Sequence, residues 1–303
     1  MRLLRLLLGN SSFVFLLAMV AGLAAGQGAS WTEHALVPVL AVIMTVSICD
    51  VSTRVFLEPR EVVRPVLIAV VLNWIVLGGA FIGLSLLLVS EPDFRNGYAL
   101  MAAVPPAVAV IPLSYLLGGS TSLALVGNLG AYVAALAITP LLSVLLLGSS
   151  LVEPARLLVI LAELIVAPIL ASRVIRRTRL LGVVKRSRAP VANWGFFLVI
   201  YTIVGLNRDT FLQEPSLLPP LIVIAFICTF VLAEVISRVA GLFGVPRAER
   251  ITMMLFGARK NDGLSAAIAL AFFGAQAAMP VAVFSAFSVI HFVWLHWQAR
   301  RMR

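Results

Sequence analysis

The chain alternates between long apolar runs and short polar segments that hold most of its charges. A helix needs about 17–25 apolar residues to cross a bilayer, so each long run predicts one membrane-spanning helix. The predicted spans are Asn10–Gly26, His34–Thr53, Val66–Leu88, Asn96–Leu117, Thr121–Leu147, Ala155–Ile175, Pro190–Leu206, Ser216–Ala240, Arg250–Gly274 and Ala277–Trp297. The pattern therefore predicts an all-α membrane protein with ten transmembrane helices.

The distribution of basic residues predicts the orientation of these spans. With the N-terminus inside, 18 of the 23 Lys and Arg residues fall in inside segments and three in outside loops. Positive charge gathers on the cytoplasmic side of membrane proteins, so we expect both termini to be cytoplasmic. The first 29 residues also resemble a signal peptide, but its removal would leave the mature N-terminus outside. The charge distribution therefore favours a first membrane helix.

Composition supports the same class and excludes others. The chain has 303 residues, of which 61% are hydrophobic and 12% charged, whereas a soluble domain has about 45–50% apolar and 25% charged residues. The net charge of +10 lies mostly in the connecting segments, where it sets topology, so we expect no nucleic-acid partner. Cys49, Cys228 and the three His residues show no metal-site spacing.

Five predicted spans precede the outer loop GSSLVEPAR and five follow it. An odd number of spans in each half gives two similar halves opposite orientations, as in the inverted repeats of secondary transporters. We therefore divide the chain into residues 1–150 and 151–303. The fourth span of each half is irregular: Pro105, Pro106 and Pro112 interrupt the first, and Gly257 to Gly263 interrupt the second. Paired interrupted spans predict a substrate site near the bilayer midplane.

The second interrupted span carries four consecutive polar residues, Arg259, Lys260, Asn261 and Asp262, at membrane depth. A charged side chain there costs about 2.5–3.5 kcal/mol on the mildest scale and faces protein or a water-filled cavity. These residues, with Pro105 and Pro106 at the first interruption, are candidates for a substrate or ion site.

With these residues in view, the chain resembles the bile acid:sodium symporter superfamily, which also contains arsenite efflux proteins. The segments that carry the resemblance are PVLAVIMTVSICDVSTRVF, VLIAVVLNWIVLGGAF, AVPPAVAVIPLSYLLGG, SLALVGNLGAYVAALAITPLL, FGARKNDGLSAAIALAFF and MPVAVFSAFSVIHFVWL. They look like that family's helices 2 to 5, 9 and 10, in order and spacing. The resemblance implies a core domain of helices 3–5 and 8–10, a panel domain of helices 1, 2, 6 and 7, and broken, crossing helices 4 and 9.

The chain departs from the family at the positions that bind sodium. The resemblance implies polar ligands after the helix 4 break, in helix 5 and near the helix 9 glycine. This chain has Val110 and Ile111 at the first place, Ala124 and Asn128 at the second, and Leu255 at the third. A hard cation needs several oxygen ligands, so we expect sodium coupling of the usual kind to be lost and a proton to be the favoured coupling ion.

Two amides could line the site. A family Gln in helix 3 appears here as Asn73, and Asn128 lies in the fifth span. The alternative is hydrogen bonding between helices, worth about 0.6 kcal/mol on average. The pair Asn73-Trp74 looks closer to the arsenite branch, but Pro106 stands where that branch has a Cys.

Arg259 and Lys260 admit three interpretations. One of them could occupy the space of the missing sodium as a tethered cation that holds backbone carbonyls of the crossing helices. Either could bind an anionic substrate, because Arg and Lys recognise carboxylates and phosphates. Alternatively, Asp262 could pair with one of them, since residues three apart on a helix are neighbours.

Two further titratable residues lie inside predicted spans. Glu234 could carry a coupling proton, or it could form an ion pair with Arg238 four residues later. His291 could relay protons, although a histidine hydrogen-bonded between helices is the favoured interpretation.

The sequence thus predicts a secondary transporter, not an enzyme, that moves a small organic anion by alternating access. It predicts a multi-pass protein of the bacterial inner membrane with lipid and a small anion as partners, no cofactor, and no defined oligomeric state. Proton-coupled efflux of arsenite-type oxyanions or metalloids is one alternative. A non-transporting membrane sensor is another, although a sensor usually carries an appended soluble domain. The sequence has no HExxH or GxSxG motif for a membrane enzyme.

Overall fold

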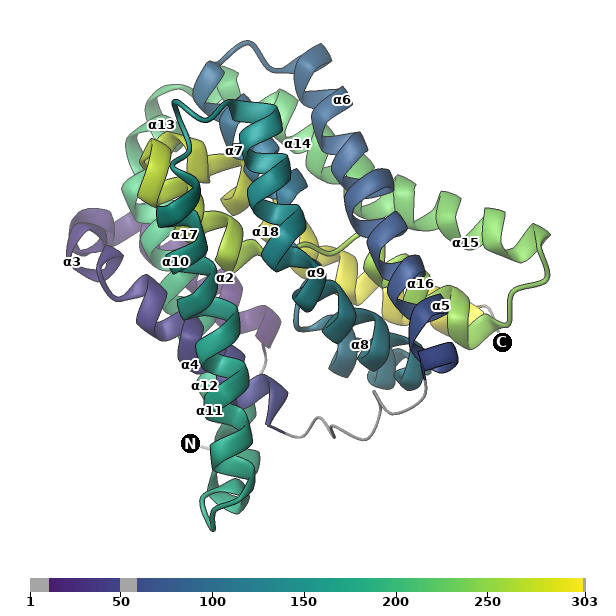
Figure 1. Ribbon diagram of the computed structural model, residues 1–303. Coiled ribbons are helices and arrows are strands. Elements are labelled where there is room, and N and C mark those ends of the chain that lie inside the picture. Colours follow the sequence, from purple (N-terminus) through teal and green to yellow (C-terminus); the bar gives the residue numbers. More distant parts are fainter. Residues whose placement is uncertain (1–10, 50–58, 302–303) are drawn as a thin grey trace.

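The computed structural model describes residues 11–49 and 59–301, and every regular element in these ranges is a helix (Figure 1). The elements before the middle loop are α2 (Ser11–Ala25), η1 (Gly26–Gly28), α3 (Ala29–Glu33), α4 (Leu36–Ile48), α5 (Pro59–Val70), η3 (Val71–Gly78), α6 (Gly79–Leu88), α7 (Pro92–Ala103), α8 (Val110–Leu117) and α9 (Thr121–Leu147).

The elements after that loop complete the bundle. They are α10 (Pro154–Leu161), η4 (Ala162–Val166), α11 (Ala167–Arg176), α12 (Leu181–Leu206), α13 (Arg208–Gln213), η5 (Pro215–Leu217), α14 (Leu218–Phe226), η6 (Ile227–Val231), α15 (Leu232–Leu242), α16 (Arg247–Phe256), α17 (Asp262–Phe273) and α18 (Ala275–Arg301). The elements η3, η4 and η6 are π-helical turns within longer helices, and η1 and η5 are 3₁₀ turns.

The prediction of an all-α membrane protein is confirmed. In the described residues, six helices are long and apolar enough to cross a membrane. They are Phe13–Glu33, Val62–Leu88, Thr121–Leu147, Pro154–Arg176, Leu181–Leu206 and Pro215–Leu242. Helices also occupy the other predicted spans, but they are short, broken or only partly apolar. The count of ten spans therefore stays a prediction.

Some of the predicted features fall outside the described residues. They are the end of the second span and the basic residues Arg2, Arg5, Arg54 and Arg303.

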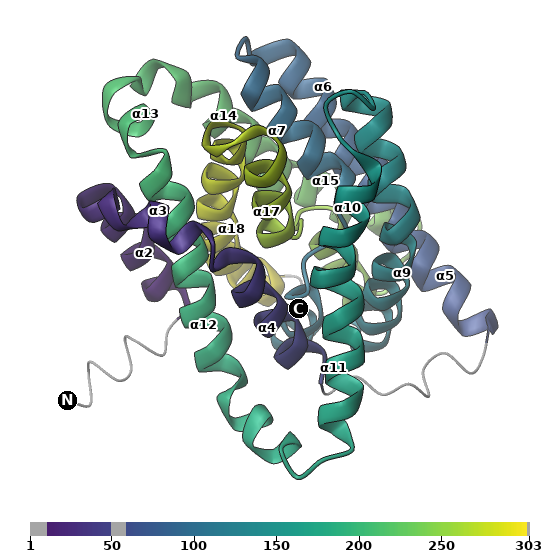
Figure 2. The same cartoon turned by 60° about the vertical axis from the view of Figure 1, so that its left-hand side comes forward.

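The helices pack in two groups that meet along the middle of the molecule (Figure 2). In the first group, α12 lies against α2, α3 and α4, and α11 lies against α4. In the second group, α5 packs on α9, α7 on α18, and α15 on α16. Contacts of α17 and α18 with α4, α2 and α12 join the groups.

Small residues let the helices of the second group come close. Gly97 of α7 faces α18, and a Cβ added there would lie 2.2 Å from the carbonyl oxygen of Ala277. Small side chains at such crossings allow the tight packing that membrane helices depend on. This contact fixes α7 against α18.

Two helices are interrupted, at the places the sequence predicted. Residues 104–109 separate α7 from α8, and residues 257–261 separate α16 from α17. The half-helices pair across the two interruptions, since α7 contacts α17 and α8 contacts α16. The pairing brings the two interruptions together in the second group.

Candidate functional site

The first break (residues 104–109) results from its two consecutive prolines. Val104 is extended, with φ −77° and ψ 159°, as expected for a residue before proline. Pro105 and Pro106 lack the N–H that would continue the helix. The prediction that Pro112 also interrupts the span is wrong. Pro112 lies in the first turn of α8, where a proline's missing N–H has no helical partner to lose.

The second break (residues 257–261) ends where a new helix is capped. Gly257 closes α16, and the side-chain oxygen of Asn261 accepts a hydrogen bond from the N–H of Leu264 at 3.1 Å. An asparagine is a favoured N-cap because it satisfies one of the free N–H groups at a helix start. Asn261 thus sets the start of α17, and Asp262 is the first residue of that helix.

The two breaks bind each other through their backbones. Pro106 and Lys260 form an isolated antiparallel bridge. The N–H of Asn261 donates to the oxygen of Pro105 at 3.0 Å, and the N–H of Ala107 donates to the oxygen of Arg259 at 3.4 Å. Irregular backbone at membrane depth is tolerated only where such partners or a cavity satisfy it.

Lys260 fixes this junction with its side chain. Its ammonium donates to the Oδ1 of Asn73 at 2.8 Å, and to the carbonyl oxygens of Ala102 at 3.0 Å and Val104 at 2.9 Å. The ring centroid of Trp74 lies 5.7 Å from the same nitrogen. The side chain is 2% exposed. An ammonium has three donors, so all three are used within the protein and none remains for a substrate.

Asn73 connects the third span to the second break. Its amide nitrogen donates to the carbonyl oxygens of Phe256 at 3.3 Å and Arg259 at 3.2 Å, while its oxygen accepts from Lys260. The residue is fully buried within the π-helical turn η3. Such turns are frequent at functional sites because they redirect side chains.

Helix α9 supports the first break. The amide of Asn128 donates to Ala107 O at 3.1 Å, the hydroxyl of Tyr132 to Pro106 O at 3.0 Å, and that of Thr139 to Ala103 O at 2.9 Å. Tyr132 also accepts from the amide of Asn261 at 2.8 Å, which joins α9 to the second break. Tyr132 and Thr139 were not predicted from the sequence, although their spacing from Asn128 places all three on one helix face.

Arg259 is the charged residue of the second break whose side chain is not satisfied. It is 6% exposed, and its Nε and Nη2 have no hydrogen-bond partner in the described residues. Its charge acts on Asp262 and on His291 of α18. Asp262 accepts a hydrogen bond from Ser285 at 3.0 Å through Oδ2, while its Oδ1 is unpartnered. No ion pair joins Asp262 to Arg259 or Lys260 within the described ranges.

The remaining candidates lie apart from the junction or lack the expected partners. Glu234 forms the ion pair with Arg238 that the sequence offered as its alternative role, at 2.6 Å. His291 is buried, yet neither ring nitrogen has a hydrogen-bond partner among the described residues. The expectation of a hydrogen-bonded histidine is therefore wrong. His291 instead packs on Phe230 and Trp294, with ring centroids 4.9 Å and 5.3 Å away.

Three of the five positions that resemble sodium-binding positions of the family are apolar and fully buried, whereas Ile111 is partly buried and Asn128 is polar. Val110, Ala124 and Leu255 are all 0% exposed and belong to the hydrophobic core. In the described part of the chain, no three His, Cys, Asp or Glu side chains gather as a metal site would require.

A cleft lies between the two helix groups, beside the junction. It has about 310 Å³ of empty space, and Asn261 is the polar residue among those that line it. The apolar lining residues are Leu40, Ile43, Met44, Val108, Leu164, Phe196 and Leu264. Part of that space is open to solvent. Asn261, at the start of α17, thus connects the cleft to the junction.

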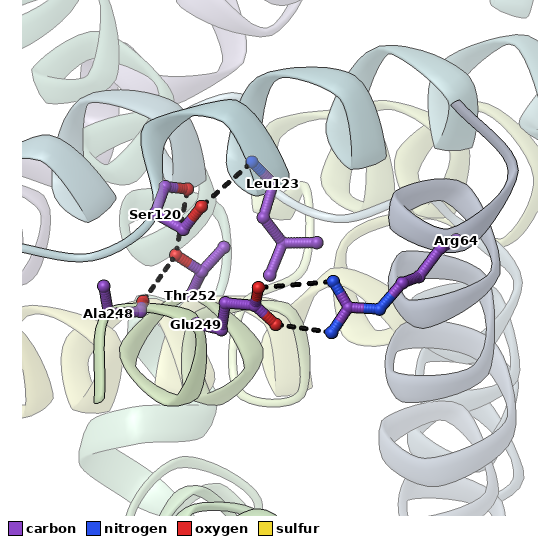
Figure 3. A network of polar contacts seen from close by, with 6 residues as sticks. All are labelled: Arg64, Ser120, Leu123, Ala248, Glu249 and Thr252. Carbon is purple, nitrogen blue, oxygen red and sulfur yellow. Dashed lines mark hydrogen bonds and ion pairs between the residues drawn. The ribbon is translucent and has the colours of Figure 1, made fainter. Parts of the chain in front are cut away.

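A polar network joins α16, the half-helix before the second break, to neighbouring helices (Figure 3). Arg64 and Glu249 form a two-point ion pair at 2.6 Å and 3.2 Å. The hydroxyl of Thr252 lies 3.2 Å from the carbonyl oxygen of Ser120 and 2.7 Å from the hydroxyl of Ser114. These contacts tie α16 to α5, α8 and the start of α9.

Comparisons with known proteins agree with this architecture. The family described as the sodium bile acid symporter family matches residues 37–214. The protein "Uncharacterized sodium-dependent transporter YocS" of Bacillus subtilis (strain 168) is 25% identical over 236 residues, which cover 75% of this chain and 71% of that protein. The family match includes the first break and ends before the second.

Proposed function

Because the chain belongs to the sodium bile acid symporter family and is therefore a multi-pass membrane transporter, we propose that it moves a small organic anion by alternating access without sodium coupling of the usual kind. The contrast between the two neighbouring cations carries this proposal. Lys260 is fully bound within the protein, whereas the Nε and Nη2 groups of Arg259 have no partner among the residues that the structure describes.

Lys260 supports the proposal that sodium is not needed at the junction. In a family that couples to sodium, a tethered ammonium bound by Asn73 and two carbonyl oxygens does what a bound cation would do. It neutralises the carbonyl dipoles that converge on it and links the third span to both broken helices. Because a covalently attached cation cannot leave, it cannot carry the driving force of a sodium gradient.

Arg259 and the start of α17 support an anionic substrate. A guanidinium offers paired N–H donors that match carboxylates and related anions. The N-terminus of a helix adds a partial positive charge of about 0.5 elementary charge. Both belong to the second break, and Asn261 of that break lines the cleft. We infer that the anion binds where the cleft meets this break, held by Arg259 and the first turn of α17.

The architecture proposed with this function is a ten-helix inverted repeat. Its halves are residues 1–150 and 151–303, with both termini cytoplasmic in the bacterial inner membrane. The panel of helices 1, 2, 6 and 7 rocks against the core of helices 3–5 and 8–10, and the cleft closes and opens between them. Reporter fusions at both ends test the orientation; an outside C-terminus would contradict the paired halves.

A ligand screen with matched salts tests the function itself. The purified protein is heated with small organic acids in sodium chloride and, separately, in choline chloride. We expect one or more acids to raise the unfolding temperature equally in both salts, and the same acids to enter proteoliposomes. Stabilisation that requires sodium would contradict the proposal. The name of the Bacillus relative states sodium dependence, so the comparison of the two salts decides between the two proteins' coupling.

A further inference from the structure

Asp262 combines a satisfied and an unsatisfied carboxylate oxygen at the start of α17. Its Oδ2 accepts a hydrogen bond from Ser285 of α18 at 3.0 Å, and its Oδ1 has no partner in the described residues. The residue is partly buried and follows Asn261, which lines the cleft. The carboxyl group is thus held in place by one oxygen and can gain a new partner at the other.

The Arg259 guanidinium, which could neutralise Asp262, forms no ion pair with it in the described residues. Arg259 exerts its charge on Asp262, but no ion pair forms between them within 4.0 Å, and two guanidinium nitrogens are buried without a partner. An ion pair inside a protein is stable only when its hydrogen bonds are completed. Ionisable side chains inside membrane helices mark substrate and ion pathways, so this cation and carboxylate are candidates for such a pathway.

Other charged groups do not take the place of Arg259. Lys260 is bound to Asn73 and carbonyl oxygens, and α4 contains no charged residue. The charged residues of α7 (Asp93, Arg95) and α12 (Lys185, Arg186, Arg188) lie near the starts of those helices. On α18, Ser288 and His291 have no hydrogen-bond partner among the described residues, and the charge of Arg259 also acts on His291.

Glu234, the carboxylate that the sequence offered as a proton carrier, is already engaged. Its ion pair with Arg238 is 2.6 Å long, and the arginine side chain is 78% exposed. Glu234 and Arg238 both lie on α15, whereas Asp262 belongs to the junction.

We propose that Asp262 is the proton-binding site of this transporter, and that its proton binds together with the substrate anion because carboxylate and anion compete for Arg259. The inference rests on the proposed function, which supplies the anion. When Asp262 is ionised, its negative charge offsets the positive charge of Arg259, and the anion is attracted less strongly. When a proton from water binds the free oxygen of Asp262, the carboxyl becomes neutral and Arg259 is free for the anion.

One proton and one anion therefore cross together. On the far side the anion leaves Arg259, Asp262 releases its proton to water, and the carboxylate again faces the guanidinium. Linkage requires reciprocity: if the proton strengthens anion binding, the anion must strengthen proton binding by the same factor. The competition thus couples the two without any metal ion.

Infrared difference spectroscopy tests the proton site without knowledge of the substrate. Spectra of the full-length protein are recorded at low and high pH, and we expect a protonated-carboxyl band that is lost in Asp262→Asn. The band remains in Glu234→Gln and in Asp209→Asn. The Asp209 side chain is 78% exposed, so Asp209→Asn is the exposed control. In Ser285→Ala the band shifts in frequency, because that variant removes the hydrogen bond to the carboxyl. A band that survives in Asp262→Asn, or that is lost in Glu234→Gln, overturns the inference.

A second measurement tests the coupling. Methanesulfonate and benzenesulfonate stay ionised across the pH range, so any pH effect on their binding belongs to the protein. We expect them to raise the unfolding temperature more at low than at high pH in the wild type and in Asp209→Asn, and equally at both in Asp262→Asn. A pH effect that persists in Asp262→Asn overturns the inference but leaves anion transport intact. If these sulfonates and the screened acids fail to stabilise the protein at any pH, the proposed function fails, while the infrared band still reports on Asp262.

Discussion

The two breaks occupy matching positions in the chain but contribute opposite chemistry. The first is built from prolines and apolar residues, and it presents carbonyl oxygens to its surroundings. The second contains two cations and an amide, and it supplies side-chain donors. Interrupted helices expose carbonyls at one end and N–H groups at the other. The difference teaches that two breaks can satisfy part of each other's hydrogen-bonding groups within the protein.

The two cations of the second break differ as strongly as the two breaks do. Lys260 points toward Asn73 and the end of α7, where acceptors surround it. The charge of Arg259 acts on Asp262 of α17 and His291 of α18, and its Nε and Nη2 have no hydrogen-bond partner in the described residues. We propose that Lys260 completes the fold and that Arg259 binds the anion, and substitutions can separate these roles.

The largest effect is expected for Lys260→Ala. Removing the ammonium leaves Asn73 Oδ1 and the carbonyl oxygens of Ala102 and Val104 without their donor. A buried acceptor that loses its donor costs about 1–3 kcal/mol, and three acceptors lose theirs here. We expect the free energy of unfolding in micelles to fall by about this amount and transport to be lost. Lys185→Ala, on the exposed face of α12, is the matched control, and equal stability of the two variants would contradict the structural role of Lys260.

Arg259→Gln should instead affect binding. Its lost guanidinium nitrogens have no hydrogen bonds to break, so we expect the unfolding temperature without ligand to stay near that of the wild type. A charge-assisted contact is worth about 1.5–3 kcal/mol, so anion affinity should fall by about tenfold or more. Calorimetry with an acid from the screen measures this, with Arg186→Gln on the exposed part of α12 as control. Unchanged affinity would remove Arg259 from the site.

The positions of both breaks could be predicted from the sequence, but their chemistry could not. Consecutive prolines, and a polar cluster between glycines at membrane depth, are local signals. Which cation binds which carbonyl depends on how the half-helices meet in space. Arg259 and Lys260 lie outside any helix, so the helical period that normally predicts side-chain direction gives no guidance. The same reason explains why the Arg259–Asp262 pair expected from helical spacing does not form.

The sequence predicted Asn128 of α9 but not Tyr132, and Tyr132→Phe tests what the Tyr132 hydroxyl contributes to the first break. The variant leaves the carbonyl oxygen of Pro106 and the amide of Asn261 each short of one hydrogen bond. An unsatisfied buried group costs about 1–3 kcal/mol, so thermal unfolding should show a smaller loss than for Lys260→Ala. Tyr115→Phe is the matched control, because that side chain is 73% exposed. A loss as large in Tyr115→Phe would show that the hydroxyl of Tyr132 does not hold the breaks together.

The smallest effect is expected when sodium replaces choline, because we propose that Lys260 takes the place of the ion at the junction. Lys260 supplies the positive charge at the junction, and the buried positions Val110, Ala124 and Leu255 offer carbon where a hard cation needs oxygen. At about 100 times its dissociation constant, a bound sodium ion would add about 2.7 kcal/mol of stability. That gain would be easy to see as a rise in unfolding temperature, so its absence is informative. A saturable rise in unfolding temperature with sodium that disappears in Asn73→Leu would contradict this expectation. It would show that Asn73 and neighbouring carbonyls bind sodium beside Lys260, so that Lys260 adds a second cation and does not take the place of sodium.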